Sequence, residues 1–200
     1  SFIRSNVKPE KTWVFEFETG YRLNNNMFVT ANIYDMTINN TITWIENEFD
    51  WGYDNHTKTG TRGFEIEYKA KYEKFFCNIS YAFYSAKDKN TVDYYAADGY
   101  DKVFIGSPQN KIALAAGYHI LKNLSASTSL IYRSKQYEYN YIDSIGEGEI
   151  LNFDPTTTVN AYITYKSKYF DAGFGVNNIL NQELYWLQPY KGYAMPMPTM

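Results

Sequence analysis

Residues 169–182 read YFDAGFGVNNILNQ, and this stretch decides the fold that the rest of the chain is expected to share. Side chains of an extended strand alternate between two faces, so Phe170, Ala172, Phe174 and Val176 share one face. Asp, Gly and Asn residues occupy the other face, which is therefore polar or empty. A sheet that has lipid on one side and water on the other requires this pattern.

The same alternation recurs along the chain in segments longer than the usual globular strand of about 5 to 6 residues. It is clearest where Phe64, Ile66 and Tyr68 alternate with Glu65 and Glu67. In the second segment, residues 27–39, the alternation is weaker, and the sequence does not indicate which side chains share the apolar face. The pattern predicts about eight strands, at residues 11–23, 27–39, 60–72, 75–87, 110–120, 124–136, 157–166 and the opening stretch.

The connections between these segments alternate in length without exception. Short turns are expected at residues 24–26, 73–74, 121–123 and 167–168, and long loops at 40–59, 88–108, 137–156 and after 182. Outer-membrane β-barrels have this asymmetry, with short periplasmic turns and long extracellular loops, and strands of roughly 9 to 11 residues cross the bilayer. The chain is therefore predicted to be all-β, an antiparallel transmembrane β-barrel segment.

Composition agrees with a sheet that has one apolar face. Aromatic residues make up 19% of the chain, from 21 Tyr, 13 Phe and 4 Trp, and suit strands and surfaces where apolar groups meet water. The formal net charge of −3 does not indicate the basic surface that binds nucleic acid. The single Cys77 excludes an internal disulfide, and the absence of a run of about 18 apolar residues excludes a transmembrane helix.

The sequence predicts neither catalysis nor a bound metal or cofactor. His56 and His119 lie far apart, and neither has partners at metal-ligand spacing. Motifs of the G-x-S-x-G, H-E-x-x-H and phosphate-loop types are absent. The charged run Glu65, Glu67, Lys69 and Lys71 is interpreted as a solvated wall.

Aromatic residues in the expected long loops are the candidate ligand contacts. The alternative interpretation is a surface loop whose aromatic residues lie near a membrane interface. The candidates are Trp44, Trp51, Tyr53, Tyr94, Tyr95 and Tyr100.

Four motifs, in this order along the chain, resemble sequence blocks of TonB-dependent outer-membrane receptors. They are Val7-Lys8-Pro9-Glu10 with Glu16, Glu18 and Gly20; Tyr53-Asp54-Asn55 with Gly63-Phe64-Glu65-Ile66-Glu67; Ser107-Pro108-Gln109-Asn110-Lys111; and Val176-Asn177-Asn178-Ile179-Leu180-Asn181-Gln182-Glu183-Leu184-Tyr185.

The resemblance implies energy-coupled uptake of a scarce nutrient across the bacterial outer membrane, with a siderophore, haem, cobalamin or a glycan as the ligand. It implies outer-membrane lipid, a plug domain and TonB as partners, TonB acting through an N-terminal part. It also places residues 1–200 in the C-terminal portion of a roughly 22-stranded barrel with a plugged lumen. The plug and the final strand, expected after the Met195-to-Thr199 run, are then expected outside the chain.

Two other interpretations remain open from the residues alone. Eight strands could close on themselves as a small outer-membrane barrel with a structural or adhesive role. The aromatic-rich loops could instead stack on sugars in a soluble carbohydrate-binding β-protein.

Overall fold

The computed structural model describes residues 7–46, 51–86, 91–100, 102–142, 147–191 and 197–198. Its main element is one antiparallel eight-stranded sheet with the order β1-β2-β3-β4-β5-β6-β9-β10. These strands are β1 (Lys11–Asn24), β2 (Met27–Glu46), β3 (Trp51–Lys71), β4 (Phe75–Ala86), β5 (Asn110–Leu121), β6 (Leu124–Arg133), β9 (Thr156–Lys166) and β10 (Asp171–Val176). The smaller elements are the 3-10 helix η2 (Asp93–Tyr95), the hairpin β7 (Gln136–Ile142) with β8 (Glu147–Phe153), and the pair β11 (Tyr185–Trp186) with β12 (Met197–Pro198).

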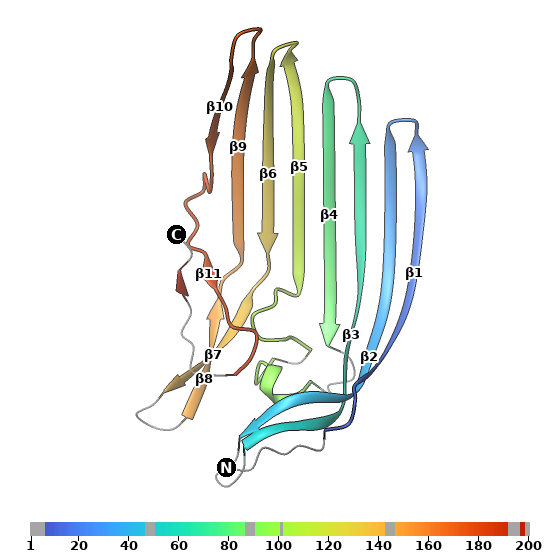
Figure 1. The fold of residues 1–200 in the computed structure, drawn as a ribbon, viewed down its shortest axis with the longest axis vertical. Helices are drawn as coiled ribbons and strands as arrows, with labels where there is room; N and C mark the ends of the chain where they lie inside the picture. The colour runs from blue at the N-terminus through green and yellow to red at the C-terminus, as the bar shows by residue number, and fades with distance from the viewer. Residues whose placement is uncertain are drawn as a thin grey trace.

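The prediction of an antiparallel all-β segment of about eight strands is confirmed. Figure 1 shows the sheet as one continuous wall, with the short turns at one end and the long connections at the other. We call these the turn end and the loop end. Within the described residues, β1 and β10 are the edges of the sheet and do not pair with each other, so these strands do not form a closed small barrel.

The prediction of a long loop at residues 40–59 is wrong, because β2 and β3 continue through most of this segment. Their pairing runs on from Thr41 opposite His56 to Glu46 opposite Trp51. The segment Ile42-Thr43-Trp44-Ile45 consists of β-branched and aromatic residues, which favour an extended backbone. Asn40, at a φ of 54°, interrupts the pairing, and the extension beyond it leaves only a tip outside the described residues.

The loop expected at residues 137–156 is also wrong, since it contains most of the β7–β8 hairpin. In the segment YEYNY, three tyrosines alternate with Glu138 and Asn140, which is a strand pattern in its own right. For the same reason the sixth strand ends at Arg133 and not at Gln136. Of the loop expected at 88–108, the structure describes residues 91–100 and 102–108, and apart from η2 they belong to no helix or strand.

Strand pairing places like side chains in rows across the sheet. Phe17, Ile33, Phe64 and Phe83 are successive partners on one face, here called the apolar face. This register also gives the second strand the facing that its sequence left undetermined, because Ile33 lies between two phenylalanines. Residues one position along each strand form the opposite, polar face.

No second layer covers the apolar face within the described residues. Trp13, Phe15 and Phe174 are 72%, 69% and 71% exposed, respectively. An apolar surface of this extent is a contact surface for a membrane or a partner. The buried hydrophobic side chains lie mainly elsewhere, in the irregular segment between β4 and β5.

On the polar face, aromatic rings lie over glycines of neighbouring strands. Tyr34 covers Gly63, its direct partner across β2 and β3, and a Cβ at Gly63 would overlap the Tyr34 ring and the Phe83 carbonyl oxygen. A Cβ at Gly173 would meet nothing closer than 3.6 Å. A side chain therefore has no space at Gly63 but has space at Gly173.

We expect Gly63→Ala to destabilise the full-length protein by about 1–3 kcal/mol, because the added methyl forces the backbone of β4 or the Tyr34 ring to move. Gly173→Ala is the matched control and should be neutral or slightly stabilising. The guanidinium unfolding midpoint of the protein in detergent measures both variants. Equal midpoints for the two variants would contradict the packing described here.

Candidate functional site

Three segments that are far apart in sequence meet at the loop end: residues 91–106, the β7–β8 hairpin and residues 181–191. Together they form what we call the loop body (Figure 1). The Gly106 amide donates to the Tyr137 carbonyl at 2.7 Å, and the Lys191 amide donates to the Tyr94 carbonyl at 2.8 Å. Ile105, with 0% exposure, is buried in this body. The loop body thus has its own small hydrophobic core and its own backbone hydrogen bonds.

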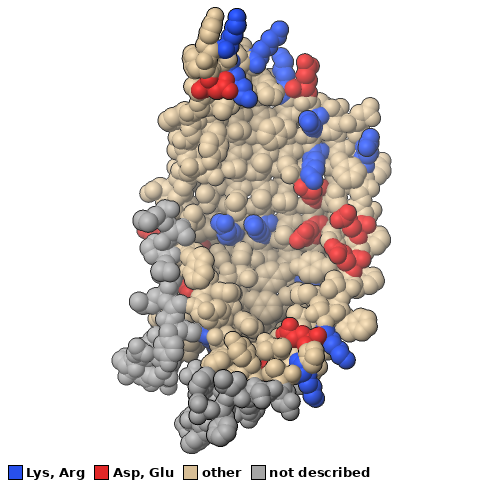
Figure 2. Space-filling model, in the orientation of Figure 1, with Lys and Arg blue, Asp and Glu red and all other residues tan. Residues whose placement is uncertain are grey.

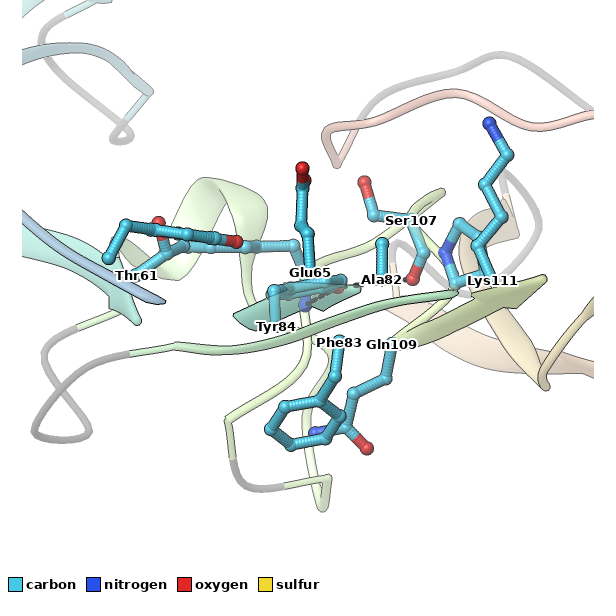
Figure 3. Close-up of a pocket in the computed structure, with 11 residues that line it drawn as sticks. Thr61, Glu65, Ala82, Phe83, Tyr84, Ser107, Gln109 and Lys111 are labelled. Atoms are coloured by element: carbon cyan, nitrogen blue, oxygen red, sulfur yellow. Dashed lines mark hydrogen bonds between the residues drawn. The ribbon is translucent and has the colours of Figure 1, made fainter. Parts of the chain in front are cut away.

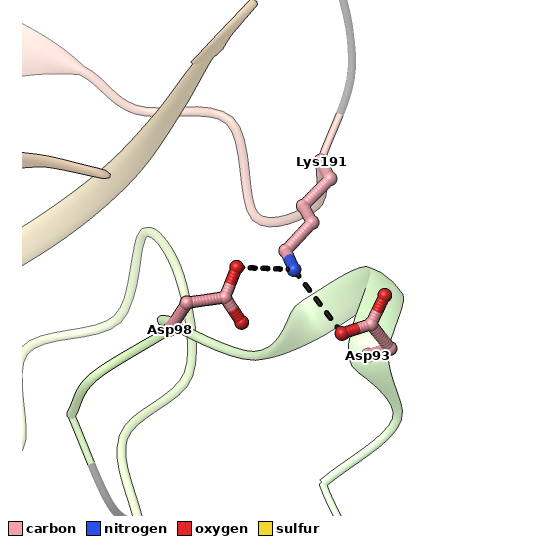
Figure 4. Close-up of polar contacts among 3 residues, drawn as sticks. All are labelled: Asp93, Asp98 and Lys191. Carbon is pink, nitrogen blue, oxygen red and sulfur yellow. Dashed lines mark hydrogen bonds and ion pairs between the residues drawn. The ribbon is translucent and has the colours of Figure 1, made fainter. Parts of the chain in front are cut away.

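Lys191 joins the last of these segments to the first. Its Nζ lies 3.2 Å from Oδ1 of Asp93, the first residue of η2, and 2.7 Å from Oδ2 of Asp98, which follows η2 (Figure 4). The ammonium also lies 5.6 Å from the centre of the Tyr139 ring. Burial lowers the pKa of Lys191, but the hydrogen bond to Asp98 and the charge of Asp93 outweigh burial, so the net pKa is raised. Lys191 is therefore a charged link between two loops.

Glu138 is buried at 0% exposure where β7 meets residues 181–191. Its Oε1 accepts a hydrogen bond from the Gln188 amide at 2.9 Å, and its Oε2 has no partner among the described residues. Burial raises the pKa of this carboxyl, and the Gln188 hydrogen bond offsets only part of the shift. Glu138 thus holds the two segments together at an electrostatic cost.

Tyrosine rings line the loop body. Tyr94 stacks on Tyr190 with ring centroids 5.4 Å apart, and it meets the edge of Tyr95 at the same distance. Tyr100 packs on Tyr137 at 4.1 Å. Because paired rings lose little freedom on meeting a planar ligand, this arrangement suits contact with an aromatic or amphipathic molecule.

The other candidate residues lie on the β2–β3 hairpin. Trp44 and Tyr53 are direct partners across the two strands, and their ring centroids are 5.2 Å apart. Burial is the main cause that raises the pKa of Tyr95, and the nearby Glu10 and Tyr53 raise it further. The backbone of Trp51 belongs to β3, but its side chain lies outside the described residues.

The structure thus places Tyr94, Tyr95 and Tyr100 in one body, and Trp44 and Tyr53 next to it. The sequence analysis did not single out Tyr137, Tyr190, Glu138 or Lys191, which complete the loop body. Tyrosines alternating through residues 137–141 were an available signal for the β7 strand. Nothing in the local sequence pairs Lys191 with Asp93 and Asp98.

Motif residues singled out for their family resemblance contact each other. The side-chain amide of Asn55 donates to the Lys8 carbonyl at 2.9 Å and to the Asn40 carbonyl at 2.7 Å. Glu10 Oε1 accepts from the Ile42 amide at 2.7 Å. These residues fix the chain preceding β1 against the β2–β3 hairpin, which is a structural role.

The polar face of the sheet carries charges in a row at mid-height. Figure 2 shows acidic side chains gathered over one side of this face and two basic side chains next to them. Register gives one row directly: Glu18, Asn32, Glu65, Ala82, Lys111 and Arg133 are successive partners from β1 to β6. A cleft of about 380 Å³ opens between this row and the loop body, lined by Glu65, Tyr84, Phe104, Ser107 and Lys111 among others (Figure 3).

The described residues offer no arrangement suited to metal binding. They contain no group of three or more His, Cys, Asp and Glu side chains able to hold a metal ion. His119 Nδ1 lies 2.8 Å from Ser125 Oγ at the turn end, and no described carboxylate orients the ring. No helix in the described part of the chain is long and apolar enough to cross a bilayer.

Comparison with known proteins identifies one family and a set of solved relatives. The family model described as "TonB dependent receptor-like, beta-barrel" matches residues 1–179. The sequence matches no curated protein.

Three of the similar solved structures are iron receptors or transporters by name. The ferripyoverdine receptor of the outer membrane of Pseudomonas aeruginosa is 16% identical, with a TM-score of 0.77 over 96% of this chain and 26% of that one. The ferric-catecholate import receptor Fiu from K12 E. coli is 19% identical, with a TM-score of 0.71 over 91% and 25%. The FrpB iron transporter from Neisseria meningitidis is 13% identical, with a TM-score of 0.70 over 98% and 30%. These likenesses show the fold, and the chain spans about a quarter of the first of these structures.

The buried Glu138 makes the stability of the loop body depend on pH. Because burial raises its folded-state pKa, the folded state binds the proton more tightly than the unfolded state, whose carboxyl titrates near the ordinary value of 4.5. The stabilising contribution is fully present below that value and is lost as pH rises through the folded-state pKa. Glu138→Gln removes the charge and keeps the oxygen that accepts from Gln188, so it should abolish this loss.

The measurement is hydrogen exchange of the amides of residues 185–191 in the full-length protein, from about pH 4 to about pH 8, corrected for intrinsic exchange. Protection should fall with rising pH in the wild type and stay level in Glu138→Gln. Glu149→Gln, a change on the exposed part of β8, is the control and should behave as the wild type. Superimposable profiles for the wild type and Glu138→Gln would refute this role.

Proposed function

The chain belongs to the TonB-dependent receptor β-barrel family, and on that basis we propose that it forms part of the barrel of a receptor that imports an iron chelate. The observation that carries this proposal is the family match over residues 1–179. Receptors of this family are bacterial outer-membrane proteins and are transporters rather than enzymes. The apolar face of the sheet therefore faces lipid, the polar face lines the lumen, and the loop body is extracellular.

Iron bound by a chelator is the ligand class that the comparisons favour. The three solved structures above carry iron, ferripyoverdine or ferric catecholate in their names. The loop body adds paired aromatic rings at the mouth of the barrel, which suit the flat and amphipathic chelating groups of such ligands. Haem, cobalamin and glycans are the competing ligands for the same test.

We propose that residues 1–200 belong to the C-terminal portion of the barrel, in which further strands complete the wall and a plug fills the lumen. Coverage of about a quarter of the ferripyoverdine receptor structure supports a longer barrel. TonB would then act on the receptor through its N-terminal part, and ligand would bind from outside. The order of the four sequence motifs supports the C-terminal position.

Among the candidate contact residues, Tyr53 and Tyr100 are the best placed to meet a ligand. They are 54% and 39% exposed, and each is held by a neighbouring ring, Trp44 for the first and Tyr137 for the second. Tyr94 and Tyr95 pack inside the loop body and support it. The side chain of Trp51 remains a proposed contact at the hairpin.

The other two interpretations are not favoured. A soluble carbohydrate-binding protein does not account for the uncovered apolar face, on which Trp13 is 72% exposed. A complete small barrel does not account for the open sheet edges at β1 and β10.

Tyr53→Ala and Tyr100→Ala should each raise the concentration for half-maximal uptake of an iron chelate about three- to tenfold, since an aromatic contact contributes about 0.5–1.5 kcal/mol. Tyr100→Phe, which keeps the ring, should stay near the wild type. Uptake of radioactive iron by iron-starved cells carrying the full-length receptor measures this, with a panel of catecholate and hydroxamate chelates.

Tyr169→Ala is the matched control, because Tyr169 is 87% exposed but lies in the β9–β10 turn on the periplasmic side. It should leave uptake unchanged. Cells that take up haem, cobalamin or a glycan through this receptor, and none of the iron chelates, would refute the proposed ligand class.

A further inference from the structure

Two basic side chains face each other on the lumenal side of the sheet. Lys111 is the second residue of β5, Arg133 is the last residue of β6, and the two are direct partners in the antiparallel register. Side chains paired in this way have Cβ atoms about 4.5–5.5 Å apart, and like charges at that distance destabilise a sheet. A counter-charge at this position would remove the repulsion.

The described residues provide no such counter-charge. Neither Lys111 nor Arg133 has a side-chain hydrogen bond or ion pair with any described residue. The next residues along the row are Ala82 on one side and Thr156 on the other, and both are uncharged. Glu65 lies two strands from Lys111, or about 9.6 Å at a strand spacing of about 4.8 Å.

Figure 3 shows how these side chains lie. The side chains of Glu65, Ser107 and Lys111 project to one side of the sheet, and Ala82, which is too short to fill the gap, lies between Glu65 and Lys111. The space above Ala82 is part of the cleft that Phe104 and Tyr84 also line. The Lys111 ammonium therefore borders open space.

Arg133 borders a second cleft, on the far side of the pair. This cleft has a volume of about 260 Å³, and its walls include Phe153, Tyr185 and Trp186. The Phe153 and Tyr185 rings are in contact, with centroids 5.1 Å apart. A cation with a planar fork of donors, set among aromatic rings, is suited to bind an oxyanion carried on a flat group.

The position of the pair decides which anions reach it. Both residues lie at the loop end of their strands, below the extracellular loop body. They also lie on the lumenal face, whereas Ile112 and Tyr132, the adjacent residues, are direct partners on the lipid face. Phosphate groups of membrane lipid therefore do not reach the pair, but a solute that enters the mouth does.

We propose that Lys111 and Arg133 form an anion-binding subsite that holds a carboxylate or catecholate oxygen of the incoming ligand. This inference rests on the proposed function for the identity of the ligand, and on the geometry above for the sign of its charge. The subsite selects anionic chelates over uncharged ones of similar size. Thr156, the partner of Arg133 on β9, offers a hydroxyl to the same anion.

The test uses the purified full-length receptor and two probes of similar size, an anionic ferric catecholate and an uncharged ferric hydroxamate. Binding is followed by quenching of intrinsic tryptophan fluorescence. Lys111→Gln and Arg133→Gln should each weaken binding of the catecholate about tenfold, as expected for loss of a charge-assisted hydrogen bond. Affinity for the hydroxamate should change less than about twofold. Lys111→Arg, which keeps the positive charge, should bind the catecholate about as tightly as the wild type does.

Lys122→Gln is the matched control, because Lys122 is exposed in the turn at the other end of the same two strands. It should alter neither affinity. Equal losses for both probes, or no loss for either, would overturn the subsite. A lower thermal stability of the Gln variants with unchanged discrimination would also overturn it, since that result assigns the pair to a carboxylate of the receptor itself.

Failure of the proposed function is distinguishable from failure of the subsite. A wild-type receptor that binds neither iron chelate contradicts iron uptake alone. The subsite is then judged by metal-free citrate in the same titration. Citrate binding that weakens about tenfold in Lys111→Gln supports the subsite, and absent or unaltered citrate binding overturns it.

Discussion

The structure depends on one constraint: backbone amides and carbonyls must be paired within the sheet, because its apolar face has no protein cover among the described residues. In lipid, an unpaired backbone group has no water to replace its partner. The eight strands meet this requirement with long antiparallel registers, such as the twelve consecutive partners from Lys11 to Arg22 on β1. Period-two alternation follows, since one face meets lipid and the other meets the lumen.

The division into a lipid face and a lumenal face determines where charged side chains can lie. Charges are costly on the lipid face, so the charged row from Glu18 to Arg133 lies on the lumenal face. Within that row, acidic residues fall on β1 and β3 and basic residues on β5 and β6, with the uncharged Ala82 between them. This row of the sheet is therefore acidic toward β1 and basic toward β6.

The spanning strands could be predicted from sequence because each one carries its own alternation, as in Phe64 to Tyr68. The loops could not be predicted as well, for two physical reasons. The polar residues at positions 40–59 indicated a loop but form a hairpin, because a strand outside the bilayer needs no lipid-facing apolar row and can include Asn55 and His56. Contacts such as Lys191 with Asp93 and Asp98 join residues more than 90 positions apart, and no local pattern encodes them.

The spanning strands and the loop body are stabilised by different contacts, and this difference affects how easily each of them rearranges. The strands are held by ladders of hydrogen bonds, whereas the loop body is held by a few buried groups: Ile105, the Glu138 contact with Gln188, and the Lys191 link. Elements with few such contacts open at a lower free energy than the sheet does. Tyr100, a proposed ligand contact, therefore lies on the part of the molecule that opens most readily, whereas the Lys111 and Arg133 pair is fixed by the register of β5 and β6. A ligand would meet an adaptable aromatic surface first and a rigid charged one second.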